Sequence, residues 1–309
     1  MRPVRVFGVE FRHPVLLAAG TCGFGEPVLD VMDLADIGGI VTKSVTLEPR
    51  AGNPAPRVAE YRHGMLNSVG LANPGLAGVL SEKLPWMRDH LGGLPVIISV
   101  AGHKPEEYAA VVDGLNGEDG FMAFELNLSC PNDARLGGRP FALDPESLEA
   151  VLDLVRPLTE RPLIVKLAPN DPDIASTAAL AVAKGADGIT AVNTIPGYLA
   201  DPRTGASALG AGPGGTSGPG ILPVGLGAVR AIARRVDVPI MGVGGIITAE
   251  DALLYLDAGA SLVQVGTGSF ADPRCAPRVA LGVARARDRA AANRPAPAPT
   301  ASGPVPSGS

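Results

Sequence analysis

The feature that most constrains the fold is a short apolar run, rich in β-branched residues, that recurs eight times with helical patterns between most copies. The runs cover residues 15–20, 40–44, 96–102, 124–130, 163–168, 188–194, 239–245 and 262–268. Strands that alternate with helices build a parallel sheet, and eight such units close into a (β/α)₈ barrel. The expected fold class is therefore α/β, a TIM barrel. An open doubly wound sheet is the competing architecture, but no G-x-G-x-x-G motif follows the first run.

Helix start signals support this alternation. Asp144 followed by Pro145 places a capping carboxylate before a proline in the first turn, and the apolar residues after them keep helical spacing. Two more helices are expected over 171–184 and 223–235, and another begins at Thr248 with a pattern like a capping box.

The two ends of the chain differ from the repeating middle. Residues 4–11 resemble a small hairpin that would plug the bottom of the barrel. From about residue 290 the chain is rich in Pro, Ala, Ser and Gly without apolar periodicity, which is typical of a disordered tail. The sequence thus predicts one domain over 1–289 and a tail over 290–309.

Composition excludes several functional classes. The net charge of −5, the pI near 5.4 and the 4% of aromatic residues argue against a nucleic-acid binder. No apolar run reaches the roughly 18 residues of a membrane span. Three cysteines, Cys22, Cys130 and Cys275, cannot supply a four-cysteine cluster, and no metal site is expected. Their odd number and the lack of a signal peptide favour a cytoplasmic protein.

Polar residues at the ends of the expected strands mark the candidate site, because barrel active sites lie at the carboxyl ends of the strands. Two of the chain's five lysines, Lys43 and Lys166, lie there in apolar company. A buried charge is costly unless it meets an opposite charge. A substrate or cofactor anion is one such partner, and a structural ion pair with Glu125 is the other.

Asparagines also gather at the expected mouth. Asn67, Asn127, Asn132 and Asn193 fall at strand ends or in the loops above them. Each alone could be an ordinary turn or cap residue. Together they indicate a planar heterocycle with N–H and C=O groups, since an amide side chain both donates and accepts hydrogen bonds.

Glycines after the last two strands indicate a phosphate. Gly244 and Gly245 precede one helix, and Gly266 and Thr267 precede the next, where barrel enzymes commonly bind phosphate groups. Tight turns explain the same letters. Cys130 directly follows the fourth strand, so either a reactive thiol or a buried inert one is open.

Longer motifs carry a resemblance to one family. They are Val-Thr-Lys-Ser with Glu-Pro-Arg-Ala-Gly-Asn-Pro (41–57), Gly-Met-Leu-Asn-Ser-Val-Gly-Leu-Ala-Asn-Pro-Gly (64–75), Asn-Leu-Ser-Cys-Pro-Asn (127–132), Gly-Ala-Asp-Gly (185–188) with Asn-Thr (193–194), Gly-Thr-Ser-Gly-Pro (215–219), Gly-Val-Gly-Gly-Ile (242–246), and Ala-Gly-Ala (258–260) with Val-Gly-Thr (265–267). In this order, from about residue 15 to 273, the chain resembles the class 1 dihydroorotate dehydrogenases. Cysteine within 127–132 is the class 1 mark, because class 2 enzymes carry serine there.

The resemblance implies an FMN-dependent barrel that oxidises dihydroorotate to orotate in pyrimidine synthesis. Cys130 would be the base that removes the C5 proton while hydride leaves C6 for flavin N5. The residues expected to line FMN are Ala19, Gly20, Lys43, Ser44, Ser99, Asn127, Lys166, Val192, Gly218, Gly244, Gly245, Gly266 and Thr267. The residues expected to hold the substrate are Lys43, Asn67, Ser68, Val69, Gly70, Leu71, Asn127, Asn132, Asn193 and Thr194. Residues 131–143 would form a lid.

The chain departs from the family pattern at a few positions. Leu222 stands where lysine is common, Tyr198 where methionine is usual, and Ser99 where many relatives have asparagine. The stretch 206–215 is unusually rich in glycine. These changes spare the expected catalytic set but affect the loop after the sixth strand.

The resemblance is closer to class 1B, whose catalytic subunit forms a homodimer core and pairs with a subunit carrying FAD and a [2Fe–2S] cluster that passes electrons to NAD. A class 1A fumarate-linked homodimer is the alternative. A dihydropyrimidine dehydrogenase-like flavoenzyme, an aldolase using Lys166 as a Schiff-base amine, and a binding barrel without activity are more distant alternatives.

Overall fold

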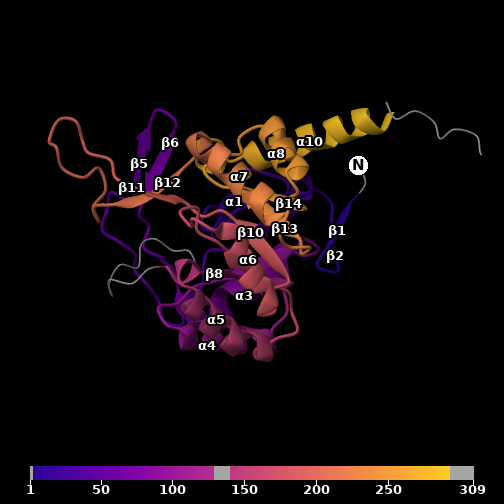
Figure 1. Ribbon diagram of the computed structural model, residues 1–309, viewed down its shortest axis with the longest axis horizontal. Coiled ribbons are helices and arrows are strands. Elements are labelled where there is room, and N and C mark those ends of the chain that lie inside the picture. Colours follow the sequence, from indigo (N-terminus) through magenta and orange to yellow (C-terminus); the bar gives the residue numbers. More distant parts are fainter. Residues whose placement is uncertain (1–2, 129–139, 293–309) are drawn as a thin grey trace, which may run out of the picture.

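Eight short strands form a closed parallel barrel in the computed structural model, which describes residues 3–128 and 140–292 (Figure 1). The barrel strands are β3 (Val15–Leu17), β4 (Gly39–Val41), β7 (Val96–Val100), β8 (Ala123–Asn127), β9 (Leu163–Lys166), β10 (Gly188–Ala191), β13 (Ile240–Val243) and β14 (Leu262–Val265). β14 pairs with β3 and closes the ring. The predicted barrel is confirmed, and each apolar run supplies one strand. In the described part of the chain, the last residues of the runs lie beyond the strand ends, at the mouth of the barrel.

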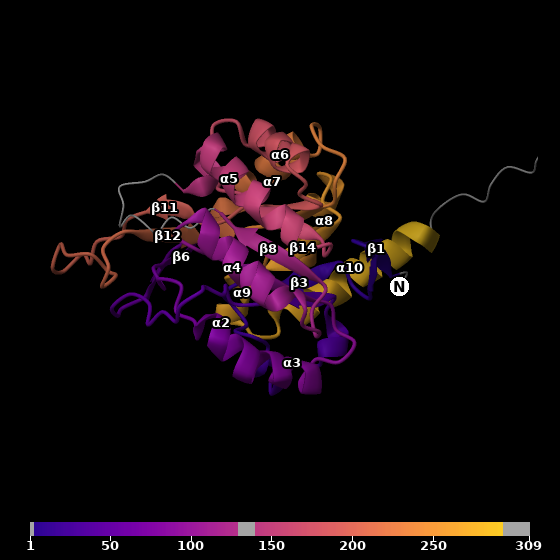
Figure 2. The ribbon, with the colours of Figure 1, turned by 90° about the horizontal axis from the view of Figure 1, so that it is seen from below.

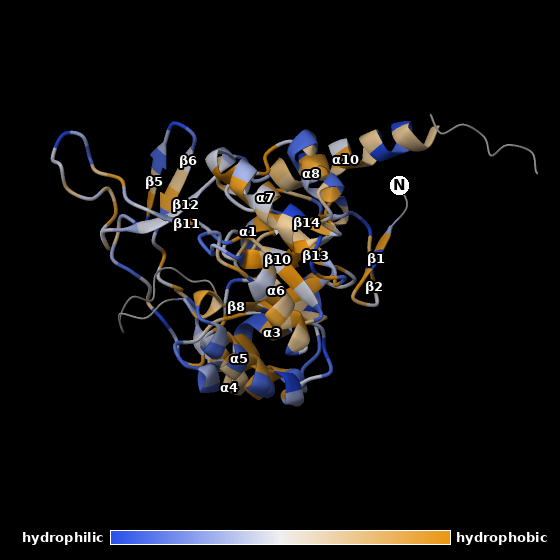
Figure 3. Cartoon of the chain, viewed as in Figure 1, coloured by the Kyte–Doolittle hydropathy of each residue, from blue (hydrophilic) through white to orange (hydrophobic). Residues whose placement is uncertain are grey.

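Helices surround the barrel. They are α1 (Glu26–Leu29), α2 (Gly75–Gly78), α3 (Leu84–His90), α4 (Pro105–Asn116), α5 (Pro145–Val155), α6 (Ile174–Ala183), α7 (Leu222–Ile232), α8 (Ala249–Asp257), α9 (Gly268–Ala271) and α10 (Cys275–Ala292). A π-helical stretch, Val79–Lys83, joins α2 to α3. In Figure 3, hydrophilic and apolar residues lie side by side on the outer helices α4, α5 and α10.

The predicted helix starts are confirmed by their caps. The Asp144 side chain accepts a hydrogen bond from Ser147 N at 3.3 Å at the start of α5. Thr248 and Asp251 form a reciprocal capping box at the start of α8. Side chains that satisfy the free N–H groups of the first turn fix where a helix begins.

The amino-terminal hairpin closes one end of the barrel. β1 (Val4–Val6) and β2 (Val9–Phe11) pair antiparallel, and Phe7 and Gly8 have positive φ angles of 54° and 76° in the two-residue turn. Val6 and Phe11 are buried in one apolar cluster with residues of seven barrel strands, including Leu16 and Ile164. The predicted plug is therefore confirmed.

A second, four-stranded sheet covers the other end, and the sequence reasoning missed it. It consists of β5 (Val58–Tyr61), β6 (Gly64–Asn67), β12 (Gly214–Ser217) and β11 (Ile195–Gly197), all antiparallel. Figures 1 and 2 place this sheet at the end of the barrel opposite the β1–β2 hairpin. In Figure 3, β5 is hydrophilic and β6 is apolar, in agreement with the burial of Met65 and Leu66.

The carboxyl-terminal helix extends beyond the expected domain boundary. α10 runs to Ala292, so residues 290–292 are helical rather than part of a tail. Residues 293–309 lie outside the described residues. Within residues 3–128 and 140–292, none of the helices combines the length and apolar character needed to cross a bilayer.

Candidate active site

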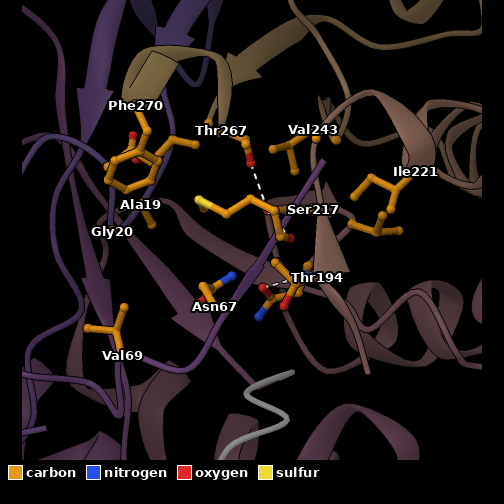
Figure 4. A pocket seen from close by; sticks show the side chains of 18 of the residues that line it. Ala19, Gly20, Asn67, Val69, Thr194, Ser217, Ile221, Val243, Thr267 and Phe270 are labelled. Atoms are coloured by element: carbon orange, nitrogen blue, oxygen red, sulfur yellow. Dashed lines mark hydrogen bonds between the residues drawn. The ribbon is translucent and has the colours of Figure 1, made fainter. Parts of the chain in front are cut away.

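A pocket opens at the carboxyl ends of the barrel strands, beneath the four-stranded sheet (Figure 4). Eighteen of the predicted site residues line it, and they come from all parts of the chain. They are Ala19, Gly20, Lys43, Ser44, Asn67, Val69, Gly70, Leu71, Asn127, Lys166, Val192, Asn193, Thr194, Gly218, Gly244, Gly245, Gly266 and Thr267. The fold thus brings together nearly the whole set chosen from strand ends and motifs.

Four predicted residues are not placed in the lining. Ser99 is fully buried behind it, and its hydroxyl lies 2.8 Å from that of Ser44. Ser68 is buried and accepts a hydrogen bond from Asn53 Nδ2 at 2.8 Å. The predictions for Cys130 and Asn132 fall outside the described residues, as do residues 131–139 of the expected lid.

Hydrogen bonds link the polar residues of the floor. Asn193 Nδ2 donates to Asn127 Oδ1 at 3.3 Å, and Asn127 Nδ2 donates to Ser44 Oγ at 3.3 Å. The Asn193 Oδ1 atom in turn accepts from Thr194 N at 2.8 Å. These contacts hold the amide groups in fixed orientations at the strand ends, which suits the recognition of a planar polar ring.

The charge of the described lining is positive. Lys43 and Lys166 contribute to it, and no carboxylate of the described residues does. Lys166 is 6% exposed, and its Nζ lies 3.7 Å from Oε1 of the fully buried Glu125. The ion pair predicted between Lys166 and Glu125 is therefore confirmed. Lys166 also lines the pocket, and a contact with a ligand anion stays a prediction.

Glycines line the part of the pocket that follows β13 and β14. Gly244 and Gly245 have φ angles of 125° and 78°, a backbone conformation that side chains rarely adopt. A Cβ at Gly266 would meet Ala18 Cβ at 3.6 Å and Thr21 Cγ2 at 3.9 Å, which is ordinary contact. The packing of the protein therefore does not require glycine at 266. The space that a side chain would occupy at this position belongs to the pocket.

Several lining residues were not predicted. Ser217 of β12 lies against Thr267, whose Oγ1 donates to Ser217 Oγ at 2.8 Å, as the dashed line in Figure 4 shows. The others are Ala18, Thr21, Val58, Met65, Ile221, Val243, Ile246, Ile247, Gly268 and Phe270. Ser217 lies inside a quoted motif, so that motif was its signal. Most of the others are apolar and carry no chemical signal in the sequence.

The two described cysteines are buried and do not line the pocket. Burial raises the pKa of the Cys22 thiol to about 12, and it also raises the pKa of Cys275. A thiol that stays protonated is a poor nucleophile and a poor base. Neither cysteine is equipped for chemistry at neutral pH.

Comparison with known proteins shows the family of this chain. A family model described as dihydroorotate dehydrogenase matches residues 1–286. Three relatives bear the name "Dihydroorotate dehydrogenase B (NAD(+)), catalytic subunit". The one from Geotalea uraniireducens is 42% identical, with 91% of each chain covered, and the one from Streptococcus pneumoniae has the same identity and coverage. The one from Bacillus pumilus is 42% identical over 90% of this chain and 89% of its own. These names confirm the expected closeness to class 1B, and the chain belongs to the dihydroorotate dehydrogenase family.

Proposed function

We propose that this protein catalyses the FMN-dependent oxidation of (S)-dihydroorotate to orotate in pyrimidine synthesis. The observation that carries the proposal is the pocket itself. Hydrogen-bonded amide side chains, two lysines and several glycines line this one pocket. A substrate that is a cyclic imide with a carboxylate matches the amides and a cation. Residues 1–289 would form the catalytic domain.

The residues present fit FMN. The backbone of Gly244, Gly245, Gly266 and Thr267 lines the end where two helices begin, and such turns bind phosphate through their N–H groups. The space that Gly266 leaves free supports the same assignment. Lys166 and Asn127, on neighbouring strands, would bind the polar edge of the flavin ring. Ser99 would act through Ser44, which its hydroxyl contacts.

The substrate would lie between the barrel mouth and the β6 strand. Asn67 is oriented by a hydrogen bond from its Nδ2 to Gly215 O at 3.0 Å, and Asn193 and Thr194 face the same pocket. These groups would hold the ring, and Lys43 would bind the carboxylate. Ser68 would support the loop formed by Val69, Gly70 and Leu71, which lines the pocket.

Cys130 would remove the proton from C5, and Asn132 would contact the ring from the same segment. FMN, when bound, would provide an acceptor for the C6 hydride, and loss of the C5 proton to Cys130 together with this hydride would leave a C5=C6 double bond. A thiol with a reference pKa of about 8.5 is mostly protonated at pH 7. The rate of the chemical step is therefore expected to rise with pH until the thiolate form predominates.

Electrons would leave to NAD through a partner subunit. The relatives named above are NAD-linked catalytic subunits, which favours a homodimer core that pairs with a subunit carrying FAD and a [2Fe–2S] cluster. We place the complex in the cytoplasm.

Orotate formation with an artificial electron acceptor tests the proposal on the single chain. The expected result is orotate from L-dihydroorotate, little product from dihydrouracil, and a large loss of rate in Cys130→Ser. Cys22→Ser is the matched control and should retain its activity, because Cys22 is buried and does not line the pocket. Turnover of dihydrouracil alone would favour the dihydropyrimidine alternative, and a protein that cannot bind FMN would contradict both.

A further inference from the structure

A buried polar cluster lies inside the barrel below the pocket, and of its four residues the proposed mechanism uses only Lys166. It consists of Glu125 on β8, Thr190 on β10 and Gln264 on β14, with Lys166 on β9 above them. Glu125, Thr190 and Gln264 are fully buried and do not line the pocket. A carboxylate is costly in such a place unless its neighbours compensate it.

The hydrogen bonds fix the orientation of the Glu125 carboxylate. Thr190 Oγ1 donates to its Oε2 at 2.7 Å, and Gln264 Nε2 donates to the same oxygen at 3.1 Å. Within residues 3–128 and 140–292, no hydrogen bond reaches Oε1, whose charged neighbour is Lys166 Nζ at 3.7 Å. Two hydrogen bonds to one oxygen and a lysine near the other hold the Glu125 carboxylate in one orientation.

The strand register connects this cluster to the pocket floor. Lys166 pairs with Asn127 on one side and with Thr190 on the other. Glu125 lies two residues before Asn127 on the same strand, so both side chains are on one face and Glu125 is the deeper of the two. Lys166 thus stands between a buried carboxylate and the ligand space.

We propose that Glu125 is a positioning residue that holds Lys166 at the pocket floor and partly offsets its positive charge, and thereby sets the reduction potential of the bound FMN. This inference rests on the proposed function, because it requires flavin in the pocket. Two-electron reduction adds negative charge to the flavin ring, and a nearby cation favours that state. Removing the carboxylate exposes the flavin to the full charge of Lys166.

The first test is the potential of bound FMN in Glu125→Gln, measured by anaerobic titration against a reference dye. The expected result is at least a tenfold tighter binding of reduced relative to oxidised FMN, which corresponds to a positive shift of about 30 mV. Thr190→Val is the matched control, because it removes a hydrogen bond to the same carboxylate and leaves its charge. In this control, the binding of reduced relative to oxidised FMN is expected to change less than threefold. An unchanged potential in Glu125→Gln, or an equal shift in Thr190→Val, would overturn the inference.

A second comparison holds even where Glu125→Gln alone does not fold. Replacing both members of a buried ion pair is tolerated better than removing one. Lys166→Gln is expected to lower the potential, and the double variant with Glu125→Gln is expected to return it toward the wild-type value. A double variant with the same potential as Lys166→Gln would show that Glu125 does not affect the reduction potential of bound FMN.

The readouts separate this inference from the proposed function. Wild-type protein that retains FMN but is not reduced by dihydroorotate would contradict the proposed substrate, and the shift in Glu125→Gln would still be measurable by dithionite titration. Normal reduction by dihydroorotate with no shift in Glu125→Gln would overturn the inference alone. A chain that binds no FMN would overturn both.

Discussion

The hydroxyl of Tyr255 donates a hydrogen bond to the carbonyl oxygen of Gly244 at 2.8 Å. It thereby joins helix α8 to the glycine turn after β13. The Tyr255 side chain is fully buried, and burial raises the pKa of its phenol, so the hydroxyl remains a donor throughout the physiological pH range. Two glycines make room for it, because a Cβ at Gly225 would lie 1.8 Å from the hydroxyl and one at Gly242 would lie 2.4 Å from the ring.

Tyr255→Phe is expected to loosen the turn that lines the proposed phosphate end. The lost hydrogen bond leaves part-buried carbonyls short of a donor, which typically costs about 1–3 kcal/mol of stability. Calorimetry of the apoprotein measures that loss, and titration with FMN measures the accompanying loss of affinity. Lower stability with unchanged FMN affinity would mean that the bond supports the fold alone.

Gly225→Ala is expected to destabilise the protein in a manner that depends on Tyr255. The added methyl group collides with the hydroxyl, and overpacking of this kind typically costs about 1–3 kcal/mol. In the Tyr255→Phe background the clash with the hydroxyl is absent, so the same substitution should cost less. A double-mutant cycle from denaturant unfolding measures the coupling, and strictly additive effects would contradict the packing described here.

Gly266→Ala is expected to reduce FMN binding at least tenfold with little change in folding. Its Cβ fits the protein at 3.6 Å from Ala18, so the methyl group occupies ligand space instead. Gly227→Ala is the control, because nothing lies within 4 Å of its added Cβ. Equal FMN affinity in Gly266→Ala and wild type would place the cofactor elsewhere.

Thiol labelling is expected to find one fast cysteine. Cys22 and Cys275 are buried with raised pKa values, so both should react slowly with a disulfide reagent at pH 8. Under the proposed function the fast thiol is Cys130, which orotate should protect and Cys130→Ser should remove. A fast thiol that persists in Cys130→Ser would contradict this assignment.

The free energy of unfolding is expected to decrease as the pH is lowered below 6.5, and part of this decrease is due to His13. Burial lowers the pKa of its imidazole below 6.5, so the unfolded chain binds a proton at this residue more readily than the folded chain. The stabilisation is therefore present above pH 6.5 and is lost as the pH falls through the lowered pKa. His13→Gln should flatten this part of the stability profile measured by urea unfolding between pH 5 and 7.5. The exposed His90→Gln is the control, and an unchanged slope in His13→Gln would contradict the prediction.

The barrel was predictable because its signals are local. Each strand is one apolar run, and caps such as Asp144 and Thr248 mark helix starts by chemistry within four residues. The four-stranded sheet was not predictable from such local signals. Gly215 of β12 pairs with Asn67 of β6, so strands far apart in the chain meet, and β12 is half glycine with little apolar patterning.

The residues of the candidate site also differ in how far the sequence could predict them. Lysines, asparagines and glycine pairs at strand ends carry a chemical signal, and most of them line the pocket. Ser99 and Ser68 sit behind the lining, because a motif does not tell which of its residues faces a ligand and which supports its neighbour. The role of Tyr255 depends on a contact with Gly244 across the fold, which no sequence pattern marks.

Anaerobic stopped-flow absorbance shows whether this pocket oxidises dihydroorotate. The purified chain, loaded with FMN, is mixed with L-dihydroorotate in parallel with Cys130→Ser and with dihydrouracil as an alternative substrate. We expect fast bleaching of the flavin band by dihydroorotate, strongly slowed in Cys130→Ser and absent with dihydrouracil. A flavin band that dihydroorotate leaves unchanged would contradict this expectation.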